Sequence, residues 1–512
     1  MLHPVLPAVR PLPLFDVAAL RRIEQAAAAA LPPHTLMQRA GLAVARLALA
    51  LAPHARTVWV ACGPGNNGGD GLEAAMHLRR WGARPVVTWL GDEARAPADA
   101  RASLQRARDA GVAFADAPPA GLGANDLCID ALLGIGAARA PAGRMAEWLR
   151  ALRSSPAKVL AVDVPTGLDA DTGVLQQPED APHSIAACGR HDWAAGSKHA
   201  ESGRLHTLTL LALKPGLFTA QGRDACGRLW FDDLGVTPAE PPAAWLNAPG
   251  PRAPRPHASH KGSWGDVVVI GGECDATHGV AMAGAALLAA SAALHGGAGR
   301  VYVSLLGDGG PMLDASQPEL MFRRFDALEL GGMTAVCGCG GGSAVRGVLP
   351  AALAQAPRLV MDADALNAMA QDGDLQRALG QRATRGQVTV LTPHPLEAAR
   401  LLGRSAGEVQ ADRLAAAQAL AARWQCVAVL KGSGSVIASP HEPPHINPTG
   451  NARLGTPGTG DVLAGVVGAR LAAGCPAFEA ACSAVWEHGA LADTWNGGEA
   501  LTAGALARRL GG

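Results

Sequence analysis

The sequence predicts an α/β protein with two domains, each built on a parallel sheet covered by helices. Three observations support this prediction. At 512 residues, the chain exceeds the ~250–300 residues at which a single hydrophobic core stops growing. Apolar runs of strand length alternate with helical stretches in both halves. Hydrophobic residues make up 49% of the chain and charged residues only 17%, which is typical of a compact protein with a large core.

In the first half, four short apolar runs are expected to be strands, at residues 57–62, 85–90, 126–130 and 159–163. Residues 72–81, between the first two runs, have the periodicity of a helix. Strands that alternate with helices predict a parallel sheet covered on both faces. Ligands of such open sheets bind beyond the carboxyl ends of the strands, and the notable loops of this half all follow a strand.

The second half has the same alternation of strands and helices. Its expected strands lie at residues 266–270, 300–305, 334–336, 359–361, 388–391 and 427–430. Between the halves, seven prolines occur from Pro238 to Pro256. Because proline fixes φ and lacks an N–H donor, we expect this segment neither to join a sheet nor to continue a helix. The expected domains are therefore residues 1–237 and 257–512, joined by a linker at 238–256.

Charge and cysteine content exclude several classes of function. Lysine and arginine total 44, as do aspartate and glutamate, so the net charge is zero, and no nucleic-acid or acidic-membrane partner is expected. The ten cysteines show no metal-ligand spacing. Without a signal-like segment, isolated thiols predict a reduced, cytoplasmic protein. The longest alanine-rich stretch, residues 26–31, is far shorter than the ~20 residues that cross a membrane.

The first strand of the N-terminal half is followed by the glycine-rich sequence GPGNNGGDG at residues 63–71. Consecutive Asn and Gly residues tolerate positive φ, so such a turn can present backbone N–H groups to a phosphate. The sequence is not the GxGxxG dinucleotide fingerprint. The alternative is a purely structural strand-to-helix turn in which Asp70 is the helix N-cap.

Two further loops carry polar groups after strands, DALLGIGAAR at residues 130–139 and VDVPTGLD at 162–169. A doubly wound sheet would bring these loops close to the first one. Asn67, Asp130 and Thr166 would then supply hard oxygen ligands, which suit an alkali or alkaline-earth cation. Asp163 remains as a possible proton-transfer group.

NNGGDG, DALLGIG and VDVPTGLD, in this order, resemble the NAD(P)HX epimerase domain of the bifunctional NAD(P)H-hydrate repair enzymes, over about residues 22–235. The resemblance implies a Rossmann-like three-layer fold, a K⁺ site at Asn67, Asp130 and Thr166, and Asp163 as the catalytic residue. It also implies contacts with the hydrated nucleotide at Asn66, Asn67, Gly68, Gly69, Asp70, Gly134, Ile135, Gly136, Ala137, Ala138, Arg139, Ala140 and Asp163. The chain departs from the family at Thr166, where serine is common, and at residues 175–205, which we interpret as a loop insertion.

In the C-terminal half, the small-residue sequence GTPGTGD at residues 455–461 precedes an apolar run at 462–467 that is typical of a helix start. Small residues let the backbone approach an anion, and a helix N-terminus adds partial positive charge. Asp461 would lie beside this cradle, where a carboxylate can handle a proton on a reacting hydroxyl. The alternative is a glycine-rich turn that only caps a core helix.

Other polar groups of this half also follow expected strands. His394 lies in a proline-clamped loop, and Lys431 begins the sequence KGSGS, where a lysine can act as a point charge on phosphate. The P-loop order GxxxxGK[ST] is absent. The loop at 338–342 exposes bare backbone, whereas Asp364, one of two acids after a strand, is equally well explained as a helix N-cap.

HKGxxG, DADALN, TPHPLE, LKGSGS and GTGD occur in the order found in the ribokinase-like domain of ADP- or ATP-dependent NAD(P)HX dehydratases, which residues 257–510 resemble. The resemblance implies ADP or ATP with Mg²⁺, and Asp461 as the catalytic residue. It implies contacts with the hydrate at Ala285, Gly340, His394 and Asp461, and with the nucleotide at Lys431, Gly432, Ser433, Gly434, Ser435 and Gly460. The family loop GPGLG reads GCGGG here, and Leu396 replaces a usual glycine.

Together, the two resemblances imply repair of hydrated nicotinamide cofactors. The first domain would interconvert the R and S forms of NADHX and NADPHX, and the second would dehydrate the S form to NAD(P)H. Two alternatives stay open: a small-alcohol (vitamin-precursor) kinase, and an N-terminal half that is only a nucleotide-binding module. A homo-oligomer is expected.

Overall fold

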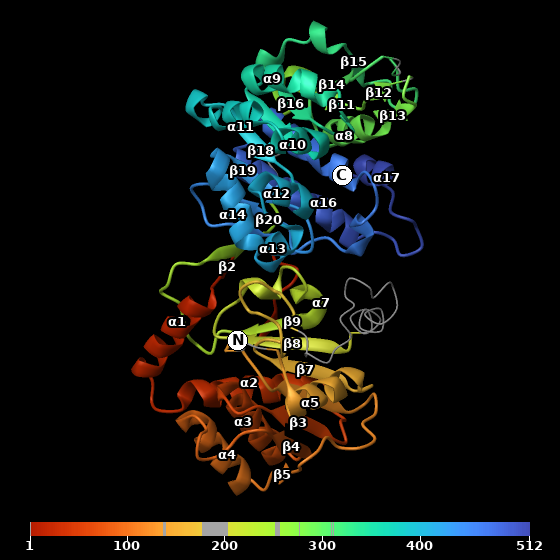
Figure 1. Ribbon diagram of the computed structural model, residues 1–512. Coiled ribbons are helices and arrows are strands. Elements are labelled where there is room, and N and C mark those ends of the chain that lie inside the picture. Colours follow the sequence, from red (N-terminus) through yellow and green to blue (C-terminus); the bar gives the residue numbers. More distant parts are fainter. Residues whose placement is uncertain are drawn as a thin grey trace. The chain divides into compact units, whose positions relative to one another are not determined.

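Two sheets, each belonging to its own unit of the chain, organise this computed structural model. The structure describes residues 2–136, 140–176, 203–250, 256–275, 277–308, 310 and 312–511. The first unit comprises residues 1–7 and 13–244, and the second comprises residues 8–12 and 245–512. Both units are α/β with mainly parallel strands, as predicted (Figure 1).

The first unit holds an eight-stranded sheet in the order β1-β9-β8-β7-β6-β3-β4-β5. All neighbours are parallel except β1 and β9. The strands are β1 (His3–Pro4), β3 (Val58–Cys62), β4 (Pro85–Trp89), β5 (Ala113–Phe114), β6 (Leu127–Ala131), β7 (Lys158–Val162), β8 (Leu205–Leu210) and β9 (Arg228–Asp232). The four predicted strands of this half are confirmed. From β3 the chain turns first to β4 and later to β6 on the other side, so a topological switch point lies at the ends of β3 and β6.

Helices cover both faces of this sheet because each strand alternates its side chains between two cores. Val58 and Val60 of β3 pack toward α1–α3, whereas Trp59 packs toward α5. The helical elements are α1 (Val17–Ala30), α2 (Thr35–Leu51), α3 (Asn66–Arg80), α4 (Ala98–Asp109), α5 (Gly143–Ser154), η1 (Pro215–Leu217) and α7 (Gly222–Cys226).

The glycine-rich sequence after β3 forms the first turns of α3 rather than a loop of positive φ. Gly68 and Gly69 have negative φ, and close packing explains why these two positions are glycine. A Cβ at Gly68 would overlap the Gly63 carbonyl, and one at Gly69 would lie 2.6 Å from Met37 Sδ. The interpretation of Asp70 as the N-cap is wrong, because the N-cap is Gly65 and Asp70 lies inside the helix.

The second unit holds a longer sheet in the order β15-β14-β11-β16-β17-β18-β19-β20-β21-β10. From β15 to β19 the neighbours are parallel, whereas β20 runs antiparallel to both β19 and β21. The strands are β10 (Ala244–Leu246), β11 (Asp266–Gly271), β14 (Arg300–Leu305), β15 (Met321–Phe322), β16 (Thr334–Cys337), β17 (Arg358–Met361), β18 (Val388–Leu391), β19 (Val427–Leu430), β20 (Val436–Ala438) and β21 (His445–Ile446). All six predicted strands of this half are confirmed.

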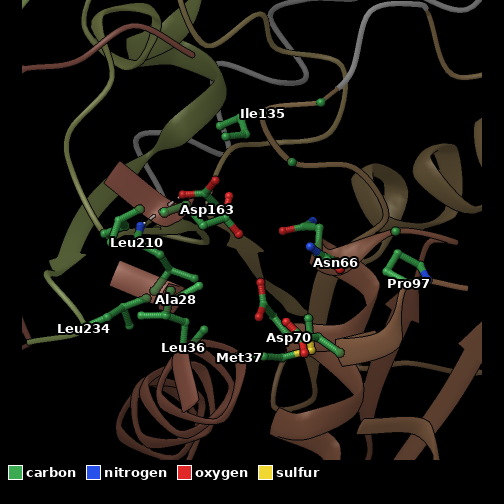
Figure 2. A pocket seen from close by; sticks show the side chains of 18 of the residues that line it. Ala28, Leu36, Met37, Asn66, Asp70, Pro97, Ile135, Asp163, Leu210 and Leu234 are labelled. Carbon is green, nitrogen blue, oxygen red and sulfur yellow. Dashed lines mark hydrogen bonds between the residues drawn. The ribbon is translucent and has the colours of Figure 1, made fainter. Parts of the chain in front are cut away.

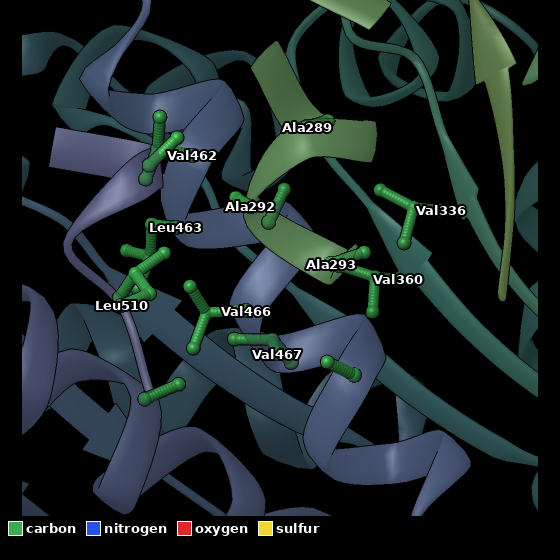
Figure 3. Packing of buried hydrophobic residues seen from close by; sticks show 14 of the residues in the cluster. Ala289, Ala292, Ala293, Val336, Val360, Val462, Leu463, Val466, Val467 and Leu510 are labelled. Atoms are coloured by element: carbon green, nitrogen blue, oxygen red, sulfur yellow. The ribbon is translucent and has the colours of Figure 1, made fainter. Parts of the chain in front are cut away.

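Ten helices of the described part of this unit pack around that sheet. They are α8 (Ala283–His295), α9 (Val345–Gln355), α10 (Ala363–Ala370), α11 (Gly373–Gly380), α12 (Pro395–Leu402), α13 (Ala406–Ala411), α14 (Arg413–Trp424), α15 (Thr459–Ala472), α16 (Ala477–Asp493) and α17 (Ala503–Arg508). Small side chains let α8 and α15 approach closely, since a Cβ at Gly465 would overlap the Ala289 carbonyl. Figure 3 shows Ala289, Ala292 and Ala293 of α8 near the valines of α15.

The proline-rich segment was predicted to join no sheet, and this is wrong for three of its residues. Ala244–Leu246 form β10, which pairs in parallel with β21 through Trp245 and Leu246. The reason is local: residues 243–248 form a proline-free run between Pro242 and Pro249, so backbone N–H donors are available there. Among the described residues, no helix is both long and apolar enough to cross a membrane.

Candidate active sites

A cavity of about 590 Å³ lies at the carboxyl edge of the first sheet. It is lined by α1, by the segment that enters α2, and by the residues that follow β3, β6, β7 and β8 (Figure 2). Gly68, Gly69 and Ala140 do not line it, and Ala137–Arg139 lie outside the described residues. The predicted site residues that do line it are Asn66, Asn67, Asp70, Gly134, Ile135, Gly136 and Asp163.

Asp163 follows β7 in a conformation that few aspartates adopt. Its φ is 66°, in the left-handed region that costs energy for a residue with a Cβ. The Asp163 N–H donates to the Leu208 carbonyl at 2.7 Å. Its Oδ1 accepts from the Leu210 N–H at 3.1 Å and from Lys214 Nζ. The strained backbone therefore holds the carboxylate between β7 and β8, at the mouth of the cavity.

Lys214 forms an ion pair with the Asp163 carboxylate. No role was predicted for this lysine from the sequence. The side chain is 1% exposed, and Nζ also donates to Thr209 Oγ1 at 2.9 Å and to the Leu210 carbonyl at 2.7 Å. Burial lowers the pKa of Lys214, against the opposing effect of Asp163. A lysine that directly follows an apolar run and precedes Pro215 was the available signal.

Two more carboxyl groups face this cavity. Burial raises the pKa of Asp70 well above its usual range, and the nearby Asp163 and Glu24 raise it further. Burial and Asp163 also raise the pKa of Glu24, which lies on α1. The sequence carried no signal for Glu24, because an acid on an amphipathic helix is ordinarily a solvent-facing residue.

Two of the three predicted cation ligands, Asp130 and Thr166, are in contact, and the third, Asn67, lies against the loop that follows Asp130. Thr166 Oγ1 donates to Asp130 Oδ1 at 2.6 Å, and the Thr166 N–H donates to Asp130 Oδ2 at 3.1 Å. Asn67 Oδ1 faces the same loop, 3.2 Å from the position of a Cβ at Gly134. Asn67 Nδ2 is buried without a hydrogen-bond partner among the described residues.

The charge of Asp130 is consistent with a bound cation. The residue is 4% exposed, and the structure gives it no ion pair in the described part of the chain. Burial accordingly raises the pKa of the Asp130 carboxyl. A carboxylate, a hydroxyl and an amide oxygen are hard donors, so the residues present fit an alkali cation.

The second unit gathers polar groups where β16, β17, β18 and β19 end. Lys431 Nζ donates to Asp362 Oδ1 at 2.6 Å, and Thr392 Oγ1 donates to the same oxygen at 2.9 Å. Cys339, Asp362 and Asp461 place one polar atom each within 4.8 Å of one another. Burial, together with Asp362, raises the pKa of Asp461 to about 7.

Helix α15 begins directly at this cluster. Its N-cap is Gly458 with φ of 88°, so Thr459, Gly460 and Asp461 form the first turn. A Cβ at Gly460 would lie 3.3 Å from Lys431 Nζ. The N-terminal end of a helix and a lysine ammonium therefore face the same space, an arrangement that attracts anions.

The glycine loop after β16 meets α8 at two of the predicted residues. Gly340 has a φ of 58°, and a Cβ there would lie 2.8 Å from the Ala285 Cβ. The alternative interpretation of Asp364 as an N-cap is wrong. The N-cap of α10 is Asp362, and Asp364 Oδ2 instead accepts the Gly342 N–H at 2.8 Å, which fixes the loop.

His394 is the N-cap of α12, and its ring is part of a capping box. Nδ1 accepts from the Leu396 N–H at 3.0 Å and the Glu397 N–H at 3.2 Å, while Nε2 lies 3.3 Å from Glu397 Oε1. Burial lowers the pKa of His394 and raises that of Glu397. Glu397 was missed, although the spacing of a cap followed by Glu three residues later was the signal.

The predicted nucleotide contacts after Lys431 form a tight turn. Gly432 and Gly434 have positive φ, and Ser435 Oγ donates to the Gly432 carbonyl at 3.2 Å. Of the predicted residues, the structure brings Lys431, Gly460 and Asp461 together. Ser433 and Ser435 lie on the turn that follows β19.

Comparisons with known proteins cover both halves of the chain. A family model described as NAD(P)H-hydrate dehydratase matches residues 267–511, and one described as YjeF-related protein N-terminus matches residues 33–194. The bifunctional NAD(P)H-hydrate repair enzyme Nnr of Escherichia coli K12 is 36% identical over 499 residues, which cover 93% of this chain and 88% of that protein.

Two further relatives match the C-terminal half. The ADP-dependent (S)-NAD(P)H-hydrate dehydratase of Neisseria meningitidis is 41% identical over 261 residues, which cover 49% of this chain and 84% of that protein. A solved structure of the ADP/ATP-dependent NAD(P)H-hydrate dehydratase of Bacillus subtilis, co-crystallised with ATP/Mg²⁺, is 31% identical with a TM-score of 0.43. It covers 51% of this chain and 91% of that one.

Proposed function

The chain belongs to the family of bifunctional NAD(P)H-hydrate repair enzymes, and we propose a division of its two reactions between the two sites described above. It is an enzyme that epimerises hydrated NAD(P)H and dehydrates the S form to NAD(P)H. We assign epimerisation to the cavity of the first unit and dehydration to the cluster around Asp461. The observation that carries the second assignment is a carboxylate with a pKa of about 7 at a helix start that faces Lys431.

Dehydration requires hydroxide to leave, and phosphorylation makes this possible. Hydroxide is a poor leaving group, whereas phosphate leaves readily. Asp461 would take the proton of the hydroxyl as it attacks the nucleotide, and a base with a pKa near the working pH suits this task. Lys431 and the Gly460 N–H at the start of α15 would stabilise the transferring phosphoryl group. Ala285, Gly340 and His394 are the proposed contacts with the hydrate.

The phosphate donor is ADP or ATP in this proposal, since relatives are named for one or both nucleotides. The residues Lys431–Ser435 and Gly460 would contact it. Mg²⁺ bound with the nucleotide supplies charge neutralisation at the phosphates. It usually takes one or two carboxylate ligands besides phosphate oxygens, and Asp362 is a buried carboxylate that fits this role.

In the first unit, Asp163 would transfer the proton of the hydroxyl group that C6 of the nicotinamide ring carries. The cavity-lining residues Asn66, Asn67, Asp70, Gly134, Ile135 and Gly136 would contact the hydrate. Potassium held by Asn67, Asp130 and Thr166 would neutralise the buried Asp130. Thr166 and Asp130 join the loops after β7 and β6 through their hydrogen bonds, so this site would also fix the position of those loops.

One assay tests the proposal: the full chain is incubated with mixed R and S hydrates and with ADP or ATP. Absorbance of reduced nicotinamide should recover completely with release of phosphate, because epimerisation feeds the R form into dehydration. A stable phosphate ester in place of NAD(P)H would indicate a small-alcohol kinase. Recovery that stops when the S form is exhausted would indicate that the first unit is only a nucleotide-binding module.

Two expectations from the sequence remain predictions within this proposal, a homo-oligomeric state and a cytoplasmic location. The first is tested by light scattering of the purified chain, with a mass above 52.0 kDa as the expected result. Fractionation of cells that express the untagged chain tests the second.

A further inference from the structure

Two carboxyl groups of the N-terminal cavity have opposite surroundings. Asp163 Oδ1 accepts from Lys214 Nζ and from the Leu210 N–H. Oδ2 has no partner within the described residues. Asp163 is thus a carboxylate with one oxygen anchored and the other available toward the cavity.

Asp70 lies in α3 and lines the same cavity (Figure 2). The part of the chain that the structure describes gives it no hydrogen bond and no ion pair. Lys214, the buried cation of this cavity, is engaged with Asp163, and the arginine that lines the cavity, Arg21, lies on α1. Burial raises the pKa of Asp70 well above its usual range. The charged and titratable groups around it, or lining the same cavity, are Cys62, Glu24, Glu73, Asp99, Asp163, Lys214, Arg21 and His34.

We propose that Asp70 is a second catalytic residue of the epimerisation, the general acid that works with Asp163 as the general base. This inference rests on the epimerase function proposed for the cavity. It follows from the geometry because both side chains face one cavity, and one is held by a buried ammonium whereas the other has no ion pair among the described residues. Environments that separate the protonation of two carboxyl groups are the usual means of assigning acid and base roles.

The proposed step balances without any added reagent. Asp163 Oδ2 takes the proton of the C6 hydroxyl, the C6–O bond becomes a carbonyl, and the C6–N1 bond breaks. Its electron pair goes to N1, which receives the proton of Asp70. Rotation about the C5–C6 bond presents the other carbonyl face, and the same two transfers in reverse close the ring with inverted configuration. Each carboxyl group ends in its starting state.

The test uses the full chain without nucleotide, so that only epimerisation of purified R hydrate is followed, by chromatographic separation of R and S. Asp70→Asn should lower kcat by ~10²–10⁴-fold while KM changes by no more than a few-fold. Its residual rate should lose the decline at high pH that the wild type shows, because an acid must be protonated to act. Asp224→Asn is the matched control, since burial also raises the pKa of Asp224 but the residue does not line the cavity.

A second measurement is independent of activity. The pKa of Asp70 is ~3.9 in the unfolded chain and higher in the folded chain. The free energy of unfolding therefore falls as the pH rises between these two pKa values, because the folded state must give up a proton that it binds more tightly. The melting temperature of Asp70→Asn should therefore exceed that of the wild type by an increasing amount as pH rises above ~4. If Asp70→Asn keeps the kcat of the wild type, or changes only in KM, the inference is overturned. The proposed function still stands in that case, provided that the wild-type chain epimerises the R hydrate. Absence of epimerisation in the wild type would instead overturn the proposed function itself.

Discussion

Lys431 Nζ lies 2.6 Å from Asp362 Oδ1, so the residue after β19 neutralises the residue after β17. Asp362 is 2% exposed, and this pair leaves Asp461 as the carboxylate of the cluster without a paired cation. Despite its burial, the pKa of Lys431 is raised by Asp362 and Glu397. Lys431 thus keeps its positive charge, which can attract an incoming phosphate. Asp461 has no paired cation in the described part of the chain, and its raised pKa of about 7 suits a general base.

Asp461→Asn should abolish dehydration and spare nucleotide binding. The amide keeps the size of the carboxylate but takes no proton, and removal of a positioned base costs ~10²–10⁴-fold in rate. Turnover is measured by recovery of reduced-nicotinamide absorbance, and ADP or ATP binding by calorimetry. Asp374→Asn, which changes an exposed carboxylate in the first turn of α11, serves as the control. Near-wild-type turnover in Asp461→Asn would refute the assignment.

Lys431→Met should destabilise the second unit as well as weaken nucleotide binding. Removal of one partner from a buried ion pair leaves an uncompensated charge, which costs about 3–5 kcal/mol. The double variant Lys431→Met/Asp362→Asn should recover most of this loss, because the buried charge is gone, yet remain inactive. Urea unfolding of the three proteins measures the difference. Equal free energies of unfolding of the single and double variants would mean that Lys431 does not compensate the buried charge of Asp362.

Ten strands of the two sheets were predictable because buried parallel strands are continuous apolar runs, and β3, β11 and β14 are such runs. The parallel strands β8 and β9 were not predicted, because polar residues interrupt them. Asp163 and Asp461 were predictable as polar residues after or beside such elements. Lys214, Glu24 and Glu397 were not, since their roles depend on burial and on partners distant in the chain. Lys214 lies 51 residues from Asp163, and no local pattern reports that pairing.

Gly68 and Gly69 of the NNGGDG sequence do not line the cavity, and close packing explains them better than the backbone conformation that we expected. We expected positive φ, whereas Gly68 is a helical residue packed on the Gly63 carbonyl. Gly68→Ala should therefore lower the stability of the first unit by at least the ~1–3 kcal/mol typical of overpacking. Gly65→Ala is the matched control, because a Cβ there meets nothing within 4 Å. Thermal unfolding compares the two, and equal losses would contradict the packing argument.

Potassium should stabilise the first unit through Asp130 and Thr166. A ligand that binds only the folded state adds about 2.7 kcal/mol at 100 times its Kd, which corresponds to several degrees in Tm. We expect Tm to rise in KCl relative to LiCl at equal ionic strength, and Asp130→Asn to remove this difference. Thr166→Ser, which keeps the hydroxyl, should retain it. An equal Tm of the wild type in both salts would exclude the cation site.

The rate of dehydration should fall as the pH drops through about 7. A base acts only when it is deprotonated, and burial with Asp362 nearby raises the pKa of Asp461 to about 7. Below that value each unit of pH should lower kcat about tenfold. Asp362→Asn removes the like charge that contributes to the shift, so it should move the acid limb of the profile to lower pH. The measurement is kcat against pH with saturating S hydrate and nucleotide, and an acid limb that stays near 7 in Asp362→Asn would show that Asp362 does not tune the base.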